Sequence, residues 1–357
     1  MSLRLKFEML CWGITPSQSA LDALPSYQHG SVVVRDYPTT SGLILRLPGD
    51  LFVNARLRFD SRHALALDHD GQTYILRLPD GDVPIDVYPP PDYALANRRL
   101  STGKSIRIVA NTHADRVRLT PIYGCAYHCD FCDYPGMAYR RNSLGELTEG
   151  LMIALTDRIM GTPHVLVSGG TPRVDVTDYG YLNELYSALP QRFPELRFDL
   201  MFSPRGLQPG RRSARAYGNF ANRLKQWGFD ALSVNLELYN EKLRRTYMPE
   251  KQELSRDGYF MFLERAVGQF GPGKVRSVLI VGLEPEAETL KGVDALARRG
   301  VLVELSPFWA DPGTFLAQHP EPTPDKLMSV YEKAMVITTL HGIPMNPFCI
   351  PCSHNIL

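Results

Sequence analysis

Three cysteines, Cys125, Cys129 and Cys132, stand close together in the run Gly-Cys-Ala-Tyr-His-Cys-Asp-Phe-Cys. Their C-x3-C-x2-C spacing places three thiols on one short loop, directly after an apolar stretch that is typical of a buried strand. Three thiolates on one loop can bind three irons of a cubane iron–sulfur cluster and leave the fourth iron open, whereas tetrahedral zinc requires a further ligand close by. The spacing therefore favours an iron–sulfur cluster with one open iron. A zinc knuckle or a loose group of thiols is the alternative.

Three further cysteines lie near the two ends of the chain. Cys349 and Cys352 enclose a proline in a short C-terminal tail, and Cys11 lies near the N-terminus. A proline inside a C-x2-C loop favours a rigid turn with both sulfurs on one side, as metal ligands need. Together these thiols could bind a second cluster, with His354 or Ser353 as a possible fourth ligand. In the alternative, Cys11 is a small buried hydrophobic residue and the two tail cysteines bind zinc or stay free.

The first ninety residues predict a small antiparallel β domain (residues 1–90). Its strand-like stretches are separated by Pro-Gly-Asp, His-Asp-Gly and Pro-Asp-Gly turns. They cover residues 31–35, 42–47, 51–59, 64–67 and 73–78. The run Pro89-Pro90-Pro91 cannot continue a ladder of strand hydrogen bonds, so we expect a linker over residues 91–115.

From residue 116 onward, apolar strand patterns alternate with helical patterns. The predicted strands cover residues 117–122, 164–167, 198–202, 231–236, 275–281 and 301–305. The predicted helices cover residues 144–160, opened by a Ser143/Glu146 capping box, and residues 179–189, 213–227, 253–270, 286–299 and 325–340. Alternating strands and helices predict an α/β fold, in which helices cover a parallel sheet over residues 116–341. A cysteine-containing tail follows over residues 342–357. In parallel barrels the chemistry lies at the C-terminal ends of the strands.

The cysteine spacing, together with Phe131 directly before the third cysteine, resembles the radical S-adenosylmethionine (SAM) superfamily. The resemblance covers roughly residues 116 to 341. It implies a partial (β/α)6 parallel barrel and a 4Fe-4S cluster on the Cys125 loop, with an open iron that binds SAM. It implies further that Phe131 lies near the adenine and that the reduced cluster cleaves SAM to a 5′-deoxyadenosyl radical. An electron donor such as flavodoxin or ferredoxin is the partner that this chemistry requires.

The resemblance assigns further cofactor contacts to the ends of the predicted strands. The segment Ser168-Gly169-Gly170-Thr171 looks like the family's Gly-Gly-Glu segment, whose backbone binds the amino group of SAM; Thr171 replaces the usual Glu. Taken alone, such a segment is an ordinary turn, but it lies one β/α unit after the cysteine loop. Asn235 and Glu237 resemble the family's ribose-binding position, and strand alternation places them on one face with Ser233.

Three other strand ends carry weaker patterns. Gly282 and Glu284 are similar to the family's segment that flanks the adenine, although a β/α turn with a helix cap has the same pattern. Ser203 and Arg205 follow the third strand, and the arginine could bind a carboxylate of SAM or of the substrate, or be a solvated loop charge. The residues that follow or end the sixth strand could line the substrate side or simply pack: Ser306, Phe308, Trp309 and Asp311.

Composition fits a globular enzyme without a bulk electrostatic partner. The 357 residues are 44% hydrophobic and carry a formal net charge of +1, which argues against a nucleic-acid or acidic-membrane surface. No apolar run of about 18 residues predicts a membrane span, and the N-terminus does not resemble a signal peptide. Six cysteines, three of them at cluster spacing, favour a reducing cytoplasm.

We therefore expect a cytoplasmic radical SAM enzyme that abstracts hydrogen from a small-molecule metabolite, with sulfur insertion or oxidation to follow if a second cluster exists. Redox-neutral rearrangement, epimerisation or C–C bond formation is the alternative outcome, so sulfur transferase, oxidoreductase and lyase or isomerase stay open. The rival of a different class is a zinc-stabilised binding protein. No residue is assigned a catalytic role at this point.

Overall fold

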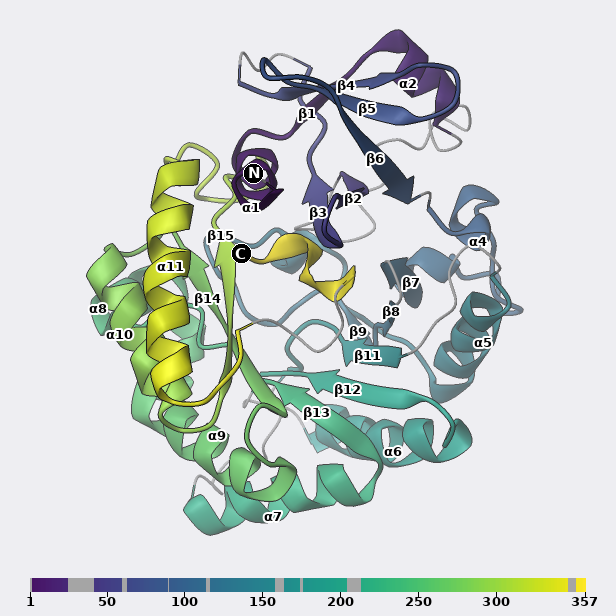
Figure 1. Cartoon of the computed structure of the whole chain (residues 1–357). Helices are drawn as coiled ribbons and strands as arrows, with labels where there is room; N and C mark the ends of the chain where they lie inside the picture. Colours follow the sequence, from purple (N-terminus) through teal and green to yellow (C-terminus); the bar gives the residue numbers. More distant parts are fainter. Residues whose placement is uncertain are drawn as a thin grey trace.

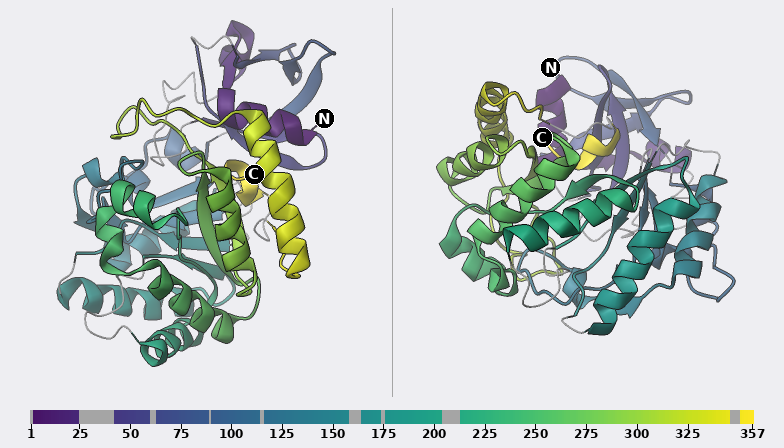
Figure 2. Two further views of the ribbon diagram at one scale, coloured as in Figure 1. Left: turned by 90° about the vertical axis from the view of Figure 1, so that its left-hand side faces the viewer. Right: turned by 90° about the horizontal axis from the view of Figure 1, so that it is seen from below.

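The computed structural model describes residues 2–24, 42–59, 63–88, 90–113, 116–157, 164–173, 176–203, 213–345 and 351–357. An N-terminal sheet lies beside a larger, curled sheet that helices wrap on its outer side (Figure 1). In Figure 1 both labelled ends of the chain lie between these two parts, and the turned views of Figure 2 place the N-terminus at the surface.

The N-terminal sheet has six strands in the order β1-β4-β5-β6-β2-β3. The four stretches predicted between residues 42 and 78 form strands and are confirmed, while the stretch 31–35 lies outside the described residues. Two strands and two helices here were not predicted. Because β1 has only three residues and β6 contains a proline, neither has a clear strand pattern. β1 pairs in parallel with β4, and the other pairs are antiparallel.

The elements of this N-terminal part are α1 (Ser2–Trp12), β1 (Ile14–Pro16), α2 (Gln18–Ala23), β2 (Leu43–Leu47), β3 (Leu51–Ala55), β4 (Leu65–His69), β5 (Tyr74–Arg77) and β6 (Val83–Tyr88).

The larger sheet has the order β15-β14-β13-β12-β11-β8-β7. Six consecutive strands are parallel, which confirms the partial (β/α)6 barrel. The edge strand β7, in the segment expected to be a linker, is antiparallel to β8 and was not predicted. The strands are β7 (Ala110–His113), β8 (Arg116–Leu119), β11 (His164–Ser168), β12 (Arg197–Met201), β13 (Phe229–Ser233), β14 (Val275–Val281) and β15 (Leu302–Pro307), with a separate ladder of β9 (Ile122–Tyr123) and β10 (Arg140–Arg141).

Six predicted helices cover the outer face of this sheet (Figure 2). They are α5 (Leu144–Leu155), α6 (Val176–Arg192), α7 (Ala214–Gln226), α9 (Arg256–Phe270), α10 (Glu286–Ala297) and α11 (Pro324–Leu340). The predicted capping box at Ser143 and Glu146 is present. The short elements α4 (Asp92–Leu95), α8 (Glu241–Tyr247), η1 (Ile106–Ile108), η2 (Tyr134–Gly136), η4 (Pro249–Glu253) and η5 (Pro351–Asn355) were not predicted, because one or two turns carry no periodicity.

The C-terminal segment links the two edges of the curled sheet. The Leu357 amide donates to the carbonyl of Leu305 in β15 at 2.8 Å, and the His354 ring stacks on His113 of β7 with centroids 6.2 Å apart. The Lys6 Nζ of α1 donates to the Ser353 carbonyl at 3.0 Å. The two chain ends therefore meet over the open side of the barrel (Figures 1 and 2).

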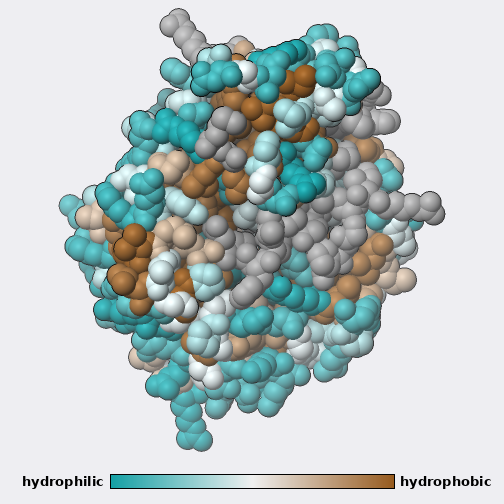
Figure 3. Space-filling view, in the orientation of Figure 1, coloured by the Kyte–Doolittle hydropathy of each residue, from teal (hydrophilic) through white to brown (hydrophobic). Residues whose placement is uncertain are grey.

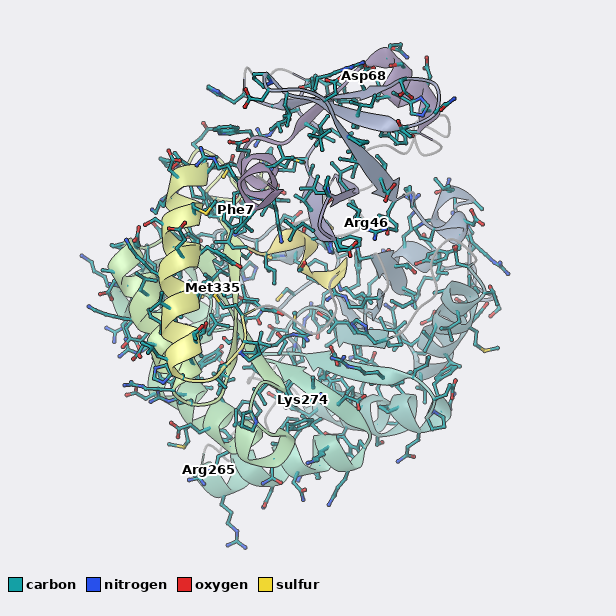
Figure 4. All side chains as sticks on the ribbon, viewed as in Figure 1. Phe7, Arg46, Asp68, Arg265, Lys274 and Met335 are labelled. Atoms are coloured by element: carbon teal, nitrogen blue, oxygen red, sulfur yellow. The ribbon has the colours of Figure 1, made fainter. Side chains whose placement is uncertain are left out.

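Helix α1 also packs against the outer helix α11. Phe7, labelled in Figure 4, is fully buried, and its ring meets that of Tyr331 edge-on at 5.6 Å. On the face drawn in Figure 3, hydrophilic and hydrophobic residues lie side by side. Among the described residues, no helix combines the length and the apolar character needed to cross a membrane.

Candidate metal centre

The parallel order brings every predicted site segment to one edge of the barrel sheet. The cysteine loop follows β8 and β9, the Gly169-Gly170 segment follows β11, and the remaining segments follow β12 to β15. Ser203 is described after β12, whereas Arg205 lies outside the described residues. Strand topology therefore places these segments together, as parallel barrels do with their active sites.

Backbone amides surround the first cysteine sulfur. The Thr171 amide donates to Cys125 Sγ at 3.2 Å and the Tyr127 amide does so at 3.4 Å. The Ala126 amide returns a hydrogen bond to the Thr171 carbonyl at 3.0 Å. Such N–H donors stabilise a thiolate and, in iron–sulfur proteins, adjust the potential of the cluster. Two backbone N–H groups therefore point at the sulfur of Cys125.

The other two cysteines face an apolar cluster beneath the loop. Cys129 is buried, and Phe131 and Cys132 pack on the same side against a cluster of buried residues: Tyr127, Leu238, Met248, Ile280, Leu283 and Phe308. Burial raises the pKa of the Cys129 thiol to about 12 and also raises the pKa of Cys132. Only strong positive charge nearby, such as bound metal, ionises thiols in such surroundings. Within the ranges that the structure describes, no three His, Cys, Asp or Glu side chains gather at a point that could hold a single metal ion.

The two glycines after β11 allow the backbone to lie directly on the cysteine loop. A Cβ at Gly169 would stand 2.5 Å from the Ile122 carbonyl oxygen, and one at Gly170 would stand 1.6 Å from the Gly124 oxygen and 2.8 Å from Cys125 Cα. The resemblance predicted a close approach to SAM at this segment, and that contact stays a prediction. In the structure the close approach is to the loop that carries the cysteines, so the glycines position the sulfur ligands.

We expect Gly170→Ala to lower the iron content of the protein, because the new methyl group must push the backbone around Cys125 aside. Overpacking of this kind typically costs about 1–3 kcal/mol. Gly180→Ala is the matched control, since a Cβ there meets nothing within 4 Å in helix α6. Iron per chain and the thermal midpoint measure both variants; equal iron in the two would contradict this role of Gly170.

A pocket opens beside the same glycines, between the ends of β11 and β12. Ser168, Gly169 and Gly170 line one side, and Met201, Phe202 and Ser203 line the other. Three predicted contact residues thus share one pocket with Ser203, which the sequence placed at the next strand end. The pocket is about the size of one water molecule, and side chains of the outer helices, Leu182, Tyr186 and Phe220, complete its lining.

Glu237 is held in an unusual backbone conformation at the end of β13. Its φ of 69° lies in the left-handed region, which a residue with a side chain rarely adopts. The Glu237 amide donates to Val278 and the Ile280 amide donates to the Glu237 carbonyl, so β14 enforces this geometry. Strain retained in this way is common at functional sites.

The Glu237 carboxylate forms an ion pair with Lys251, which the sequence analysis did not single out. Their Oε1 and Nζ atoms are 2.9 Å apart, and the side chains are only 13% and 12% exposed. Burial lowers the pKa of Lys251, but attraction to Glu237 and then to Cys129 outweighs it and raises the pKa overall. A buried positive charge therefore lies beside both the predicted ribose residue, Glu237, and the predicted cluster ligand Cys129.

The segment from α8 to η4 also fixes the cysteine loop. The Asp130 amide donates to the Tyr247 carbonyl at 2.8 Å, and the His128 ring lies 3.4 Å from the Glu250 carboxylate. The one available sequence signal was Asn240, whose side chain accepts from the Lys242 and Leu243 amides and so begins α8. Nothing in the spacing of Tyr247, Glu250 or Lys251 indicated contact with the cysteines.

The remaining predicted contacts have protein partners. Glu284 is buried and accepts from the amides of Tyr239 and Asn240, which holds the loop after β13; burial raises the pKa of its carboxyl. Asn235 accepts a hydrogen bond from Ser233 Oγ at 3.0 Å. Gly282 has a φ of 117°, as a turn after β14 requires. Their roles toward SAM stay predictions.

The loop after β15 joins the cysteine loop to the N-terminal sheet. On one side, Phe308 packs under the cysteines and the Leu316 amide donates to the Asp130 carbonyl at 3.2 Å. On the other side, the guanidinium of Arg56, just after β3, lies 4.3 Å from the centre of the Trp309 ring. Asp311 caps a turn through the Gly313 amide. Of the four residues predicted as possible substrate contacts, Phe308 packs in the apolar cluster under the cysteines. Trp309 contacts Arg56, which follows strand β3 of the N-terminal sheet.

The predicted second site is described only in part. Cys11 is buried in α1, and burial raises the pKa of its thiol to about 12. Cys352 begins the tail helix η5 with Pro351, and Cys349 lies outside the described residues. The hydrogen bond from Lys6 to Ser353 shows that α1 and the tail are neighbours.

The residues of the loop fit a cubane cluster. Three thiols on one loop, amide donors to the first sulfur and a glycine cradle pressed against its backbone are the features that such a ligand set needs. Apolar packing buries Cys129, and Cys125 and Cys132 are partly buried against the same cluster.

Comparison with known proteins finds likeness in structure only. No protein-family model matches the chain, and no curated protein matches it in sequence. Among solved structures, it is similar to the FeFe-hydrogenase maturase HydG from Carboxydothermus hydrogenoformans (20% identity, TM-score 0.46), covering 63% of this chain and 52% of that one. It is also similar to a radical SAM methyltransferase from Sphaerobacter thermophilus (18% identity, TM-score 0.47, covering 82% and 80%). A third likeness is to HemN from Escherichia coli, described as a radical SAM enzyme (18% identity, TM-score 0.38, covering 52% and 42%). The chain thus spans about half the length of the hydrogenase maturase.

Proposed function

We propose that this chain is a radical SAM enzyme that acts on a small-molecule metabolite. The observation that carries the proposal is the loop of Cys125, Cys129 and Cys132 at the C-terminal edge of a partial (β/α)6 barrel, with amide donors on the first sulfur. When bound, a 4Fe-4S cluster and SAM would supply a 5′-deoxyadenosyl radical for hydrogen abstraction. An electron donor such as flavodoxin or ferredoxin would be the redox partner, in the reducing cytoplasm that such a cluster favours.

The chain's own residues would bind, orient and shield the cofactors. The three thiolates would hold the cluster, and the apolar packing around Cys129 would keep water away from it. The carboxylate of Glu237 would accept from ribose hydroxyls, and Lys251 would hold that carboxylate in place. The backbone at Gly169 and Gly170, which lies against the cysteine loop, would bind the amino group of SAM.

The test uses protein purified without oxygen. We expect about four irons per chain for the barrel cluster, and 5′-deoxyadenosine when SAM and dithionite are added. Zinc in place of iron, or no SAM cleavage by iron-loaded protein, would overturn the proposal and favour a zinc-stabilised binding protein.

We further propose that Cys11, Cys349 and Cys352 bind an auxiliary cluster, which would support sulfur insertion or oxidation after hydrogen abstraction. The proximity of the two chain ends supports this, because Lys6 of α1 bonds to Ser353 beside Cys352. Redox-neutral rearrangement, epimerisation or C–C bond formation would be the outcome without that cluster.

We expect the triple variant Cys11→Ala/Cys349→Ala/Cys352→Ala to contain about four irons per chain while the native protein contains about eight, and still to cleave SAM. Only the barrel loop would bind SAM, so losing the second cluster separates cofactor cleavage from product formation. Iron analysis and 5′-deoxyadenosine assays measure this. About four irons in both proteins would eliminate the auxiliary cluster, and zinc bound by the tail would indicate a structural site.

A further inference from the structure

A cluster of charged residues, with Arg56 as its most buried member, lies where the N-terminal sheet meets the barrel. Arg56 and Arg58 follow β3, and both reach Glu321 in the segment after β15. Arg56 Nη1 is 2.8 Å from Glu321 Oε1, and Arg58 Nη2 is 3.2 Å from Oε2. The Ala310 amide donates to the same Oε1 at 3.0 Å.

The charges of this cluster do not balance. Among the described residues, two guanidinium groups face one carboxylate, which leaves one positive charge. The other titratable group beside Arg56 is the thiol of Cys11, whose burial raises its pKa to about 12, so it stays neutral. The Arg56 side chain is only 12% exposed. Glu321 makes its shorter contact with Arg56, and Arg58, which shares the surplus charge, is 38% exposed. A further anion beside Arg56 would therefore meet a guanidinium pair with one net positive charge.

Three donor groups in the cluster have no acceptor. The Nε and Nη2 of Arg56 and the Nε1 of Trp309 are buried, and none has a hydrogen-bond partner among the described residues. Glu321 occupies Nη1, and the Trp309 ring covers the guanidinium face at 4.3 Å. The edge that remains is the Nε–Nη2 fork, which matches the two oxygens of a planar carboxylate.

The position of this edge relates it to the candidate metal centre. The segment that carries Trp309 and Ala310 contacts the cysteine loop through Phe308 and through the bond from Leu316 to Asp130. Arg56 therefore contacts the loop after β15, and the same loop contacts the segment that carries the cysteines.

We propose that Arg56 and Trp309 bind a carboxylate of the substrate, through the Arg56 Nε–Nη2 fork and the Trp309 indole N–H. This rests on the proposed function and adds the substrate class: a small molecule that carries a free carboxylate. One uncompensated positive charge matches one carboxylate, whereas a phosphate dianion would bring a surplus negative charge. The N-terminal sheet then has a function in substrate recognition.

The test observes the tryptophans directly and needs no turnover. Protein purified without oxygen is labelled with nitrogen-15 in the indoles of its three tryptophans, and the Trp309 signal is assigned by its loss in Trp309→Phe. Propionate is titrated at constant ionic strength, with its neutral analogue propionamide, chloride and inorganic phosphate as parallel arms. We expect a saturable shift of the Trp309 signal with propionate alone, while the Trp227 signal stays unchanged.

Variants separate recognition from packing. Arg56→Lys keeps the charge but loses the fork, and we expect it to weaken propionate binding by about tenfold or more. Arg58→Lys is the matched control, because Arg58 shares Glu321 but is 38% exposed and does not contact Trp309 through its fork; binding should stay within about twofold. Trp309→Phe removes the indole N–H but keeps an aromatic ring over Arg56. We expect it to weaken propionate binding, measured by calorimetry.

No saturable shift, an equal shift with phosphate or chloride, or unchanged affinity in Arg56→Lys would overturn the inference. SAM cleavage is measured on the same preparations. Intact SAM cleavage without carboxylate binding would refute this site alone, and carboxylate binding without SAM cleavage would refute the proposed function instead.

Discussion

Replacing Cys125, Cys129 and Cys132 together by Ala is expected to reduce 5′-deoxyadenosine formation to the level seen without protein. The loop then has no thiolate to hold the cluster, and the iron that would bind SAM is lost with it. The main hydrophobic core lies in the sheet and helices, apart from this loop, so the fold should persist. The measurements are iron per chain, SAM cleavage with dithionite, and the far-ultraviolet circular dichroism spectrum.

Cys11→Ala is the matched control for this variant. Cys11 is also a buried cysteine, but it lies in α1 and packs in the main core. We expect Cys11→Ala to retain SAM cleavage, even if it loses the iron of the proposed auxiliary cluster. If the triple variant still formed 5′-deoxyadenosine, the assignment of the loop to SAM chemistry would be wrong.

Glu237→Ala is expected to have two separable effects. SAM affinity should fall by about 1–3 kcal/mol, because charge-assisted bonds to the ribose are lost. Stability should fall by about 3–5 kcal/mol as well, because Lys251 would be left as a buried charge without its partner 2.9 Å away. Denaturant unfolding and equilibrium SAM binding measure the two effects.

The double variant Glu237→Ala/Lys251→Met separates the two effects. With both charges removed, most of the lost stability should return, since no uncompensated ion stays buried. SAM affinity should stay low, because the ribose ligand is still missing. Lys291→Met is the surface control: Lys291 pairs with Glu288 but is 62% exposed, so its loss should leave the stability almost unchanged. Restored SAM binding in the double variant would assign Glu237 a purely structural role.

The sequence by itself determined the features that local pattern encodes. The C-x3-C-x2-C spacing predicted the sulfur ligands of the loop, because the three thiols lie within eight consecutive residues, Cys125 to Cys132. Alternating apolar strands and amphipathic helices predicted the six parallel strands in their order, since burial on both faces and the helical period are visible in short windows. The strand ends that bear polar residues followed directly from that alternation.

Only the tertiary structure decided which distant residues complete the site. Lys251 reaches Glu237 because η4 returns to the end of β13, and the Thr171 amide reaches Cys125 because two glycines let their backbones touch. Arg56 meets Trp309 across more than 250 residues of chain, through packing of the N-terminal sheet on the barrel. Contacts of this kind leave no periodicity, since they depend on how whole elements pack and not on spacing along one element. Short elements such as α8 and β7 escaped prediction for a related reason: their few residues are stabilised by neighbours and not by a pattern of their own.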